Sequence, residues 1–129
     1  MLKLIEGIKT VEFAREIIEC TLKKSNINIL DFGNFFNENL GVFVTIHTFP
    51  SYTLRGCIGI PMPIMSLKQS IIEASKSVIN DPRFPPLSEA ELDKIIIEVT
   101  ILTKPEKIII NNLMIKKEPA NRALFYSDV

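Results

Sequence analysis

An arginine and a cysteine stand two residues apart in the stretch TLRGCIGIP, residues 53–61, which otherwise has the composition of a β-strand. Side chains two residues apart on a strand share a face, so Arg55, Cys57 and Gly59 are expected on one side and Gly56 on the other. A guanidinium close to a thiol favours the thiolate, the nucleophilic form of cysteine. The pattern predicts Cys57 as a candidate catalytic residue.

The two glycines of this strand raise the question of what needs their space. Glycine weakens the interior of a strand and often marks a close approach to the backbone. Gly59 would leave room for a ligand or a partner backbone beside the thiol, and Gly56 would leave a gap in the core face. In the alternative, Cys57 is a buried small hydrophobe and the glycines permit tight packing of a helix on the sheet. The sequence leaves both hypotheses open.

A second set of polar candidates lies in the segment DPRFPP, residues 81–86. Its prolines hold the loop rigid, and rigid loops with charged residues often line binding sites. Arg83 and Arg55 together would hold a carboxylate or a phosphate through their forked donors. The alternative is that Arg83 forms an ion pair with Asp81 or Glu91.

Two further side chains depend on partners that the sequence does not identify. Glu98 lies in an isoleucine-rich strand and needs a partner if it is buried, for which Arg55 or Arg83 is expected. His47 is the only histidine of the chain, and whether it can serve Cys57 depends on the hairpin register. An even sum of facing residue numbers places it on the face of the cysteine, and an odd sum does not.

The composition limits the classes of partner. Fifteen basic and fifteen acidic residues balance, so neither nucleic acid nor an anionic membrane is an expected partner. No apolar stretch approaches the roughly 20 residues that span a bilayer, and no signal peptide is evident. Two cysteines and no metal-ligand spacing predict a reduced, cytoplasmic protein without a metal. The absence of a phosphate loop and of a dinucleotide fingerprint predicts no cofactor.

The hydrophobic periodicity predicts a single domain over residues 1–129 with an α+β fold, a mostly antiparallel sheet flanked by helices. Apolar residues on both faces predict that the first strand is central and covered on both sides. Between the first helix and the first strand, an irregular connection over 25–40 is expected to be held to the core by its phenylalanines. The expected helices are 8–24, 67–80 and a short one of one or two turns at 88–92, and the expected strands are 41–48, 53–59, 94–103, 107–110, 113–117 and 123–127.

The motif LRGCIG resembles the signature of the AMMECR domain family, named for the chromosomal region of Alport syndrome, midface hypoplasia and elliptocytosis. Three other segments resemble the family in the same order along residues 41–108. They are GVFVTI before the motif, INDPRFPPLSEAEL after it, and the strand and acidic turn IIIEVTILTKPEKI.

The resemblance implies an antiparallel α+β fold with a cleft near the motif, in a family whose molecular activity is unsettled. In microbes the domain often accompanies a Memo-type dioxygenase-like protein and a radical-SAM protein, which implies a shared pathway. It also implies a longer C-terminal part: the family's Leu-Pro-x-Val segment is matched only loosely here, with Ser127 and Asp128 in place of leucine and proline.

Together these observations predict a cleft that binds an anion or a small molecule, in a component of a system with radical-SAM and Memo-type partners. Two alternatives remain: a non-catalytic module that docks proteins on the LRGCIG strand, and a thiol enzyme with Cys57 as its nucleophile. Whether the chain is an enzyme is left open. The predicted ligand-binding residues are Arg55, Gly56, Gly59, Asp81, Arg83 and Glu98.

Overall fold

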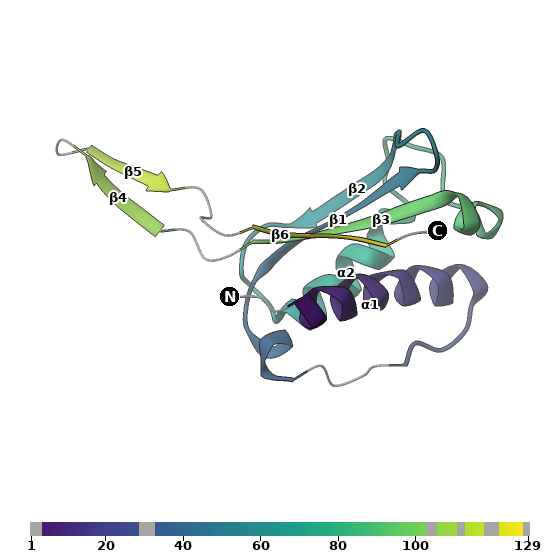
Figure 1. The fold of residues 1–129 in the computed structure, drawn as a ribbon, viewed down its shortest axis with the longest axis horizontal. Coiled ribbons are helices and arrows are strands. Elements are labelled where there is room, and N and C mark those ends of the chain that lie inside the picture. Colours follow the sequence, from purple (N-terminus) through teal and green to yellow (C-terminus); the bar gives the residue numbers. More distant parts are fainter. Residues whose placement is uncertain (1–3, 29–32, 103–105, 111–112, 118–121, 128–129) are drawn as a thin grey trace.

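The strands of the molecule form two antiparallel sheets of unequal size (Figure 1). The computed structural model describes residues 4–28, 33–102, 106–110, 113–117 and 122–127. The larger sheet has the order β2-β1-β3-β6, and the smaller one pairs β4 with β5. The strands of the two sheets are β1 (Gly41–Thr48), β2 (Leu54–Ile60), β3 (Ile95–Leu102), β4 (Glu106–Ile110), β5 (Leu113–Lys117) and β6 (Arg122–Ser127). The helices are α1 (Leu4–Lys23) and α2 (Leu67–Val78), with short 3-10 helices η1 (Asn34–Asn37) and η2 (Glu89–Lys94).

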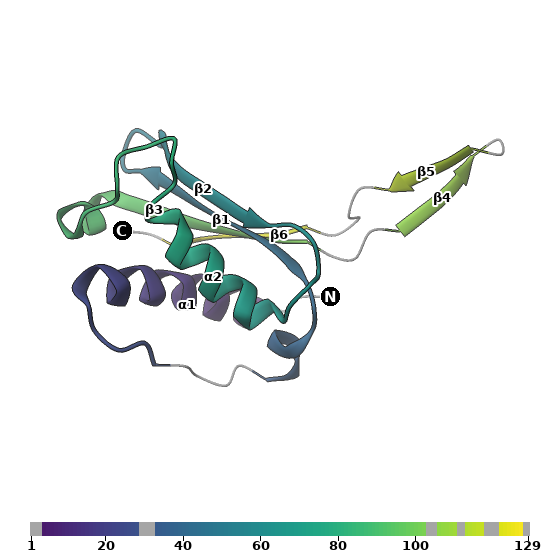
Figure 2. The ribbon, with the colours of Figure 1, turned by 180° about the vertical axis from the view of Figure 1, so that it is seen from behind.

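Both α-helices lie on one face of the larger sheet (Figures 1 and 2). The first, α1, lies along β3 and β6, and α2 lies along β1 and β2. This arrangement of an antiparallel sheet with segregated helices confirms the predicted α+β class. Neither described helix combines the length and the hydropathy needed to cross a membrane.

The helices form where apolar residues recur at helical spacing. Phe13, Ala14, Ile17 and Ile18 on α1 are all buried against the sheet and α2. The start of α2 is fixed by Ser66, whose hydroxyl accepts a hydrogen bond from the backbone N–H three residues later at 3.2 Å. The predicted extents differ at the ends only: α1 begins at residue 4 rather than 8, and α2 ends at residue 78 rather than 80.

The core lies between the helices and one face of the sheet. Alternate residues of β1 and β3 point into it, and all of them are at most 3% exposed. The loop before β1 also contributes, because Phe36 of η1 is buried and Phe35 packs against the core. This confirms that the connection is held by aromatic residues; residues 29–32, which include a third phenylalanine, lie outside the described residues. The buried strand residues are Val42, Val44, Ile46, Ile95, Ile97, Val99 and Ile101.

The opposite face of the sheet carries no helix in the described part of the chain (Figure 2). β1 lies between β2 and β3, so its prediction as a central strand is confirmed. The expectation that β1 would be covered on both sides is wrong for the described residues. The apolar residue responsible for it, Phe43, is half-buried because its ring lies across a glycine of the neighbouring strand instead of beneath a second layer.

The two glycines of β2 serve packing on opposite faces. A Cβ at Gly59 would overlap the ring of Phe43, which lies opposite it on β1. The space predicted for a ligand or a partner backbone at Gly59 is therefore filled by the chain itself. On the core face, a Cβ at Gly56 would lie 3.2 Å from the carbonyl oxygen and the Cγ2 atom of Val78. Gly56 thus permits the close approach of α2 to the sheet, as the structural alternative predicted.

The smaller sheet projects from the rest of the molecule, and the chain then returns through β6 to pair with β3 (Figures 1 and 2). Its two strands pair from Glu106↔Lys117 to Ile110↔Leu113. The predicted strands at 107–110, 113–117 and 123–127 are confirmed within a residue. The connections at 111–112 and 118–121 lie outside the described residues.

We predict that Gly59→Ala destabilises the protein, by about 1–3 kcal/mol, because the added methyl group forces the ring of Phe43 from its position. A double-mutant cycle with Phe43→Ala, measured by urea unfolding, checks this. The penalty of Gly59→Ala should be much smaller when residue 43 is alanine. An equal penalty in both backgrounds would show that the ring does not occupy this space.

Candidate functional site

The register of the β1–β2 hairpin places the side chain of Cys57 on the face that no described helix covers. Cys57 lies opposite Thr45, and its Sγ atom is within hydrogen-bonding distance of Thr45 Oγ1 at 3.3 Å. Cys57 is a free, half-buried cysteine, so its thiol is not sealed in the core. The thiol therefore has a polar neighbour in Thr45, whereas the core-facing side chains of β1 and β3 are aliphatic.

Thr45 is also the link to a carboxylate on the next strand. On the side of β3 it lies opposite Glu98, so that Cys57, Thr45 and Glu98 form one row across three strands. Glu98 is half-buried, and its Oε2 atom accepts a hydrogen bond from the hydroxyl of Tyr52 at 3.0 Å. The predicted pairing of Glu98 with an arginine is wrong, because Arg55 and Arg83 are engaged beyond the edge strand while Glu98 lies on β3.

A register shift decides the position of His47. Through Ile46↔Gly56 the facing residue numbers of β1 and β2 have an even sum, but the next pair is His47↔Leu54, which leaves Arg55 as an extra residue on β2. Alternation along β1 keeps His47 on the face of Thr45 and hence of the thiol. No hydrogen bond joins the imidazole to Cys57 in the described structure, and its buried Nδ1 atom has no partner.

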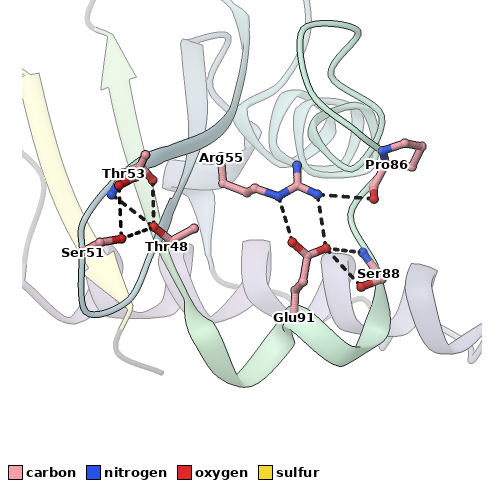
Figure 3. A network of polar contacts seen from close by, with 7 residues as sticks. All are labelled: Thr48, Ser51, Thr53, Arg55, Pro86, Ser88 and Glu91. Atoms are coloured by element: carbon pink, nitrogen blue, oxygen red, sulfur yellow. Dashed lines mark hydrogen bonds and ion pairs between the residues drawn. The ribbon is translucent and has the colours of Figure 1, made fainter.

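The aromatic side chain that completes this surface comes from the turn of the hairpin. The ring of Tyr52 stacks on the imidazole of His47, with the ring centres 4.0 Å apart and the planes 9° from parallel. Tyr52 has a φ of 56°, an uncommon value for a non-glycine residue. Hydroxyl contacts stabilise this turn: Thr48 Oγ1 lies 2.6 Å from Ser51 Oγ and accepts from the backbone N–H of Thr53 (Figure 3).

We call this group of five residues the open-face cluster. Its polar atoms are a thiol, a hydroxyl, a carboxylate, a phenol and an imidazole. Cys57 and Glu98 were predicted as site residues, and His47 was considered as a base. Thr45 and Tyr52 were not predicted as site residues from the sequence. The facing positions of the hairpin could have indicated Thr45, but no local sequence pattern indicates Tyr52. The members are Cys57, Thr45, Glu98, Tyr52 and His47.

A carboxylate and a guanidinium close the outer edge of β2 at the cysteine. The backbone N–H of Cys57 donates to Asp81 Oδ2 at 2.9 Å, and its carbonyl oxygen accepts from Arg83 Nη2 at 3.1 Å. Asp81 and Arg83 also pair with each other at 2.8 Å. These two side chains replace the neighbouring strand that the edge lacks, so we call the arrangement the edge clamp.

The edge clamp holds its acid strongly ionised. Asp81 is 2% exposed. The Arg83 guanidinium, and then the backbone N–H of Cys57, lower the pKa of the Asp81 carboxyl well below its ordinary value, although burial opposes them. In turn, the hydrogen bond to Asp81 raises the pKa of Arg83. The alternative prediction, that Arg83 forms an ion pair with Asp81, is confirmed.

Arg55 is held by a separate acid in the segment after α2 (Figure 3). Its Nε and Nη2 atoms donate to the two carboxylate oxygens of Glu91 at 2.9 and 3.2 Å, and Nη2 also donates to the carbonyl of Pro86. Glu91 closes a capping box with Ser88 at the start of η2. Burial raises the pKa of Glu91, but the hydrogen bonds from Arg55 and Ser88 outweigh it and lower that pKa.

The two predicted arginines do not meet at one binding site. Asp81 and Arg83 meet at the backbone of Cys57, and Arg55 is joined to Glu91, so each guanidinium already has a carboxylate partner. The predicted pair of arginines free to hold an anion is not what the structure contains. Within the described residues, no group of three histidine, cysteine or acidic side chains could hold a metal ion.

We predict that Asp81→Asn lowers the melting temperature at neutral pH more than Asp93→Asn, its exposed control in η2. Because the pKa of Asp81 is lowered in the folded state, its contribution to stability is complete above 3.8, the value for an unperturbed aspartate, and is lost as the pH falls below that value.

The difference in melting temperature between wild type and Asp81→Asn should therefore narrow as the pH falls from about 4 to about 2. Thermal unfolding followed by circular dichroism across this range measures it. A difference that is constant over the whole range would contradict the ionised clamp.

Comparisons with known proteins extend the resemblance beyond the motif. The AMMECR1 family pattern matches residues 11–119. Protein MJ0810 of Methanocaldococcus jannaschii is 48% identical over 113 residues, which are 87% of this chain and 56% of that protein. A protein of Methanococcus aeolicus is 45% identical over 108 residues, or 83% of this chain and 54% of its own length.

The fold has a solved counterpart among these proteins. The crystal structure of the uncharacterised protein PH0010 from Pyrococcus horikoshii matches with a TM-score of 0.70 at 39% identity, over 79% of this chain and 53% of that one. The chain thus spans about half the length of the relatives it matches. On the extent of the family match and on these identities, the chain belongs to the AMMECR1 family.

Proposed function

We propose that this protein binds a small molecule on the face of its larger sheet that no described helix covers, which we call the open face. The Cys57 thiol is the candidate reactive group. The observation that carries the proposal is the open-face cluster: a half-buried free thiol lies in one row with Thr45 and Glu98 on a face that no described helix covers. This moves the predicted ligand site from the two arginines, which have carboxylate partners, to the side-chain face of the same LRGCIG strand.

The edge clamp supports a site at this position. Asp81 and Arg83 bind both backbone polar groups of Cys57 from outside the sheet, and α2 packs closely on Gly56 from below. A reactive group acts best when its backbone is held by surrounding contacts, because fluctuations of a fraction of an ångström misalign it. In this proposal the predicted residues Asp81 and Arg83 are positioning residues, and they do not touch the ligand.

The thiol is suited to reaction with an electrophilic ligand. Thr45 Oγ1 lies 3.3 Å from the sulfur and can donate a hydrogen bond to a thiolate. A partly exposed cysteine with such a neighbour differs from the fully buried, inert cysteines of protein cores. We further propose that the protein works as an enzyme component beside radical-SAM and Memo-type proteins. This part of the proposal rests on the frequent occurrence of the domain together with those proteins in microbes.

A second candidate function, the docking of a protein on the LRGCIG strand, is favoured by one observation. Three apolar side chains at the turn of the hairpin and the start of β2 are well exposed: Phe49 at 54%, Tyr52 at 47% and Leu54 at 39%. Because the edge clamp occupies the outer backbone groups of Cys57, a partner would dock through side chains rather than by adding a strand there.

We predict that Cys57 reacts with iodoacetamide at neutral pH faster than Cys20, a half-buried cysteine on α1 that serves as an internal control. Peptide mapping by mass spectrometry gives both rates in one sample. Compounds from a broad metabolite panel that raise the melting temperature should slow the alkylation of Cys57 and leave Cys20 unchanged.

Two outcomes would reject the small-molecule proposal. One is a Cys57 that is as inert as Cys20 in the native protein. The other is a panel in which no compound alters the melting temperature or the alkylation rate. Protein docking is tested separately by Leu54→Asp, which should abolish the capture of a partner from lysate while Cys57→Ser retains it.

A further inference from the structure

We infer that the ligand of the open face is an organic cation, held by the carboxylate of Glu98 against the ring of Tyr52. This inference rests on the proposed function and names the class of molecule that the same site takes. It reverses the charge expected from the sequence, in which two arginines predicted an anion.

The first argument is the balance of charge around the LRGCIG strand. Arg55 is paired with Glu91, and Arg83 is paired with Asp81, so each of these cations is already neutralised. Glu98 forms no ion pair with any Lys, Arg or His in the described structure; the one hydrogen bond to its carboxylate comes from a neutral phenol. The uncompensated charge of the open-face cluster is therefore negative.

The second argument is the capacity of this carboxylate. An ionised carboxylate has about four lone-pair sites, and the Tyr52 hydroxyl uses one of them on Oε2. Oε1 of Glu98 makes no hydrogen bond in the described structure. Because Glu98 is half-buried, its attraction for a cation is less weakened by water than that of a fully exposed acid. An amidinium or guanidinium group presents paired N–H donors that match this acceptor.

The third argument is the aromatic platform beside the carboxylate. Tyr52 lies parallel to His47 at 4.0 Å and remains 47% exposed. Cations are attracted to the face of an aromatic ring within about 6 Å of its centre. Tyr52 has a left-handed backbone conformation, with a φ of 56°, and its hydroxyl donates a hydrogen bond to Glu98. The same residue thus supplies a ring and orients the carboxylate.

The row across the strands relates the cation to the thiol. Neighbouring strands are about 4.8 Å apart, so Glu98 and Cys57 are separated by roughly 10 Å with Thr45 between them. A molecule whose cationic end is bound by Glu98 extends over Thr45 toward Cys57 if it is about as long as a substituted benzene. Bound cation should therefore shield the thiol.

Three compounds of nearly the same shape but different charge test whether the site selects its ligand by charge or by shape. Benzamidine is a cation, benzamide is its neutral counterpart and benzoate is an anion. We expect benzamidine to shift backbone NMR signals of β1, β2 and β3 and to slow the alkylation of Cys57, whereas the other two do so at least about tenfold more weakly. That ratio corresponds to the loss of one charge-assisted interaction, about 1.4 kcal/mol.

The matched variants are Glu98→Gln and Glu73→Gln, the second of which alters an exposed acid on α2. Glu98→Gln should weaken the binding of benzamidine by about tenfold or more, and Glu73→Gln should leave it unchanged. Tyr52→Leu removes the ring and should also weaken binding. It gives an independent test if Glu98→Gln does not fold.

The outcomes distinguish this inference from the function on which it rests. Equal binding of the three compounds, or benzamidine binding that survives both Glu98→Gln and Tyr52→Leu, overturns the cationic ligand. So does the absence of any benzamidine effect on β1–β3 or on Cys57. In each of these cases, protection of Cys57 by another compound of the broad panel would leave the small-molecule site standing.

Discussion

The arrangement of the site depends on the edge clamp, in which Asp81 and Arg83 bind the backbone of Cys57. An edge strand presents unpaired backbone groups, and here two side chains take the place of the missing neighbour. Because Asp81 lies three residues after the end of α2 and its backbone N–H donates to the carbonyl of Val78, the clamp also fixes the helix relative to the strand. Gly56 allows the same helix end to approach the sheet closely. The position of the cysteine is thus determined from the edge and from the core together.

The charged residues around the LRGCIG strand differ in whether they form an ion pair. Arg55 and Arg83 hold the segment after α2 against β2, and their carboxylate partners leave no free guanidinium in this pair. Glu98, on the face of the sheet opposite the helices, forms no ion pair with a cationic side chain in the described structure. Electrostatic complementarity follows the net charge that remains after such pairing, and this is the basis on which we propose a cationic ligand for the open face.

The helices and the open-face cluster lie on opposite faces of the larger sheet. The chain spans about half of the length of its relatives, and its described helices cover one face of the sheet. The other face holds the open-face cluster, with Phe43 lying over Gly59 at its border. On this face the ring of Phe43 fills the space above Gly59, so the proposed ligand would bind at the cluster and not at the glycine.

The sequence by itself determined the α+β class, the positions of the helices and strands, and the family. These follow from local periodicity, capping and turn residues, which act over a few neighbours: Ser66 caps α2 as its pattern predicts, and GVFVTIHT is the strand β1. Cys57 and Glu98 were predicted as site residues from the LRGCIG motif and from a carboxylate in an isoleucine-rich strand, and their roles stay predictions.

The tertiary structure alone decided the partners of these residues. A shift of one residue at Ile46/His47 sets which side chains face each other, and no local pattern encodes it. The pairing of Arg55 with Glu91 joins residues 36 positions apart, and that of Tyr52 with Glu98 joins residues 46 apart. A charge or a hydroxyl has its chemical role only through such neighbours, and these contacts exist only once the chain has folded.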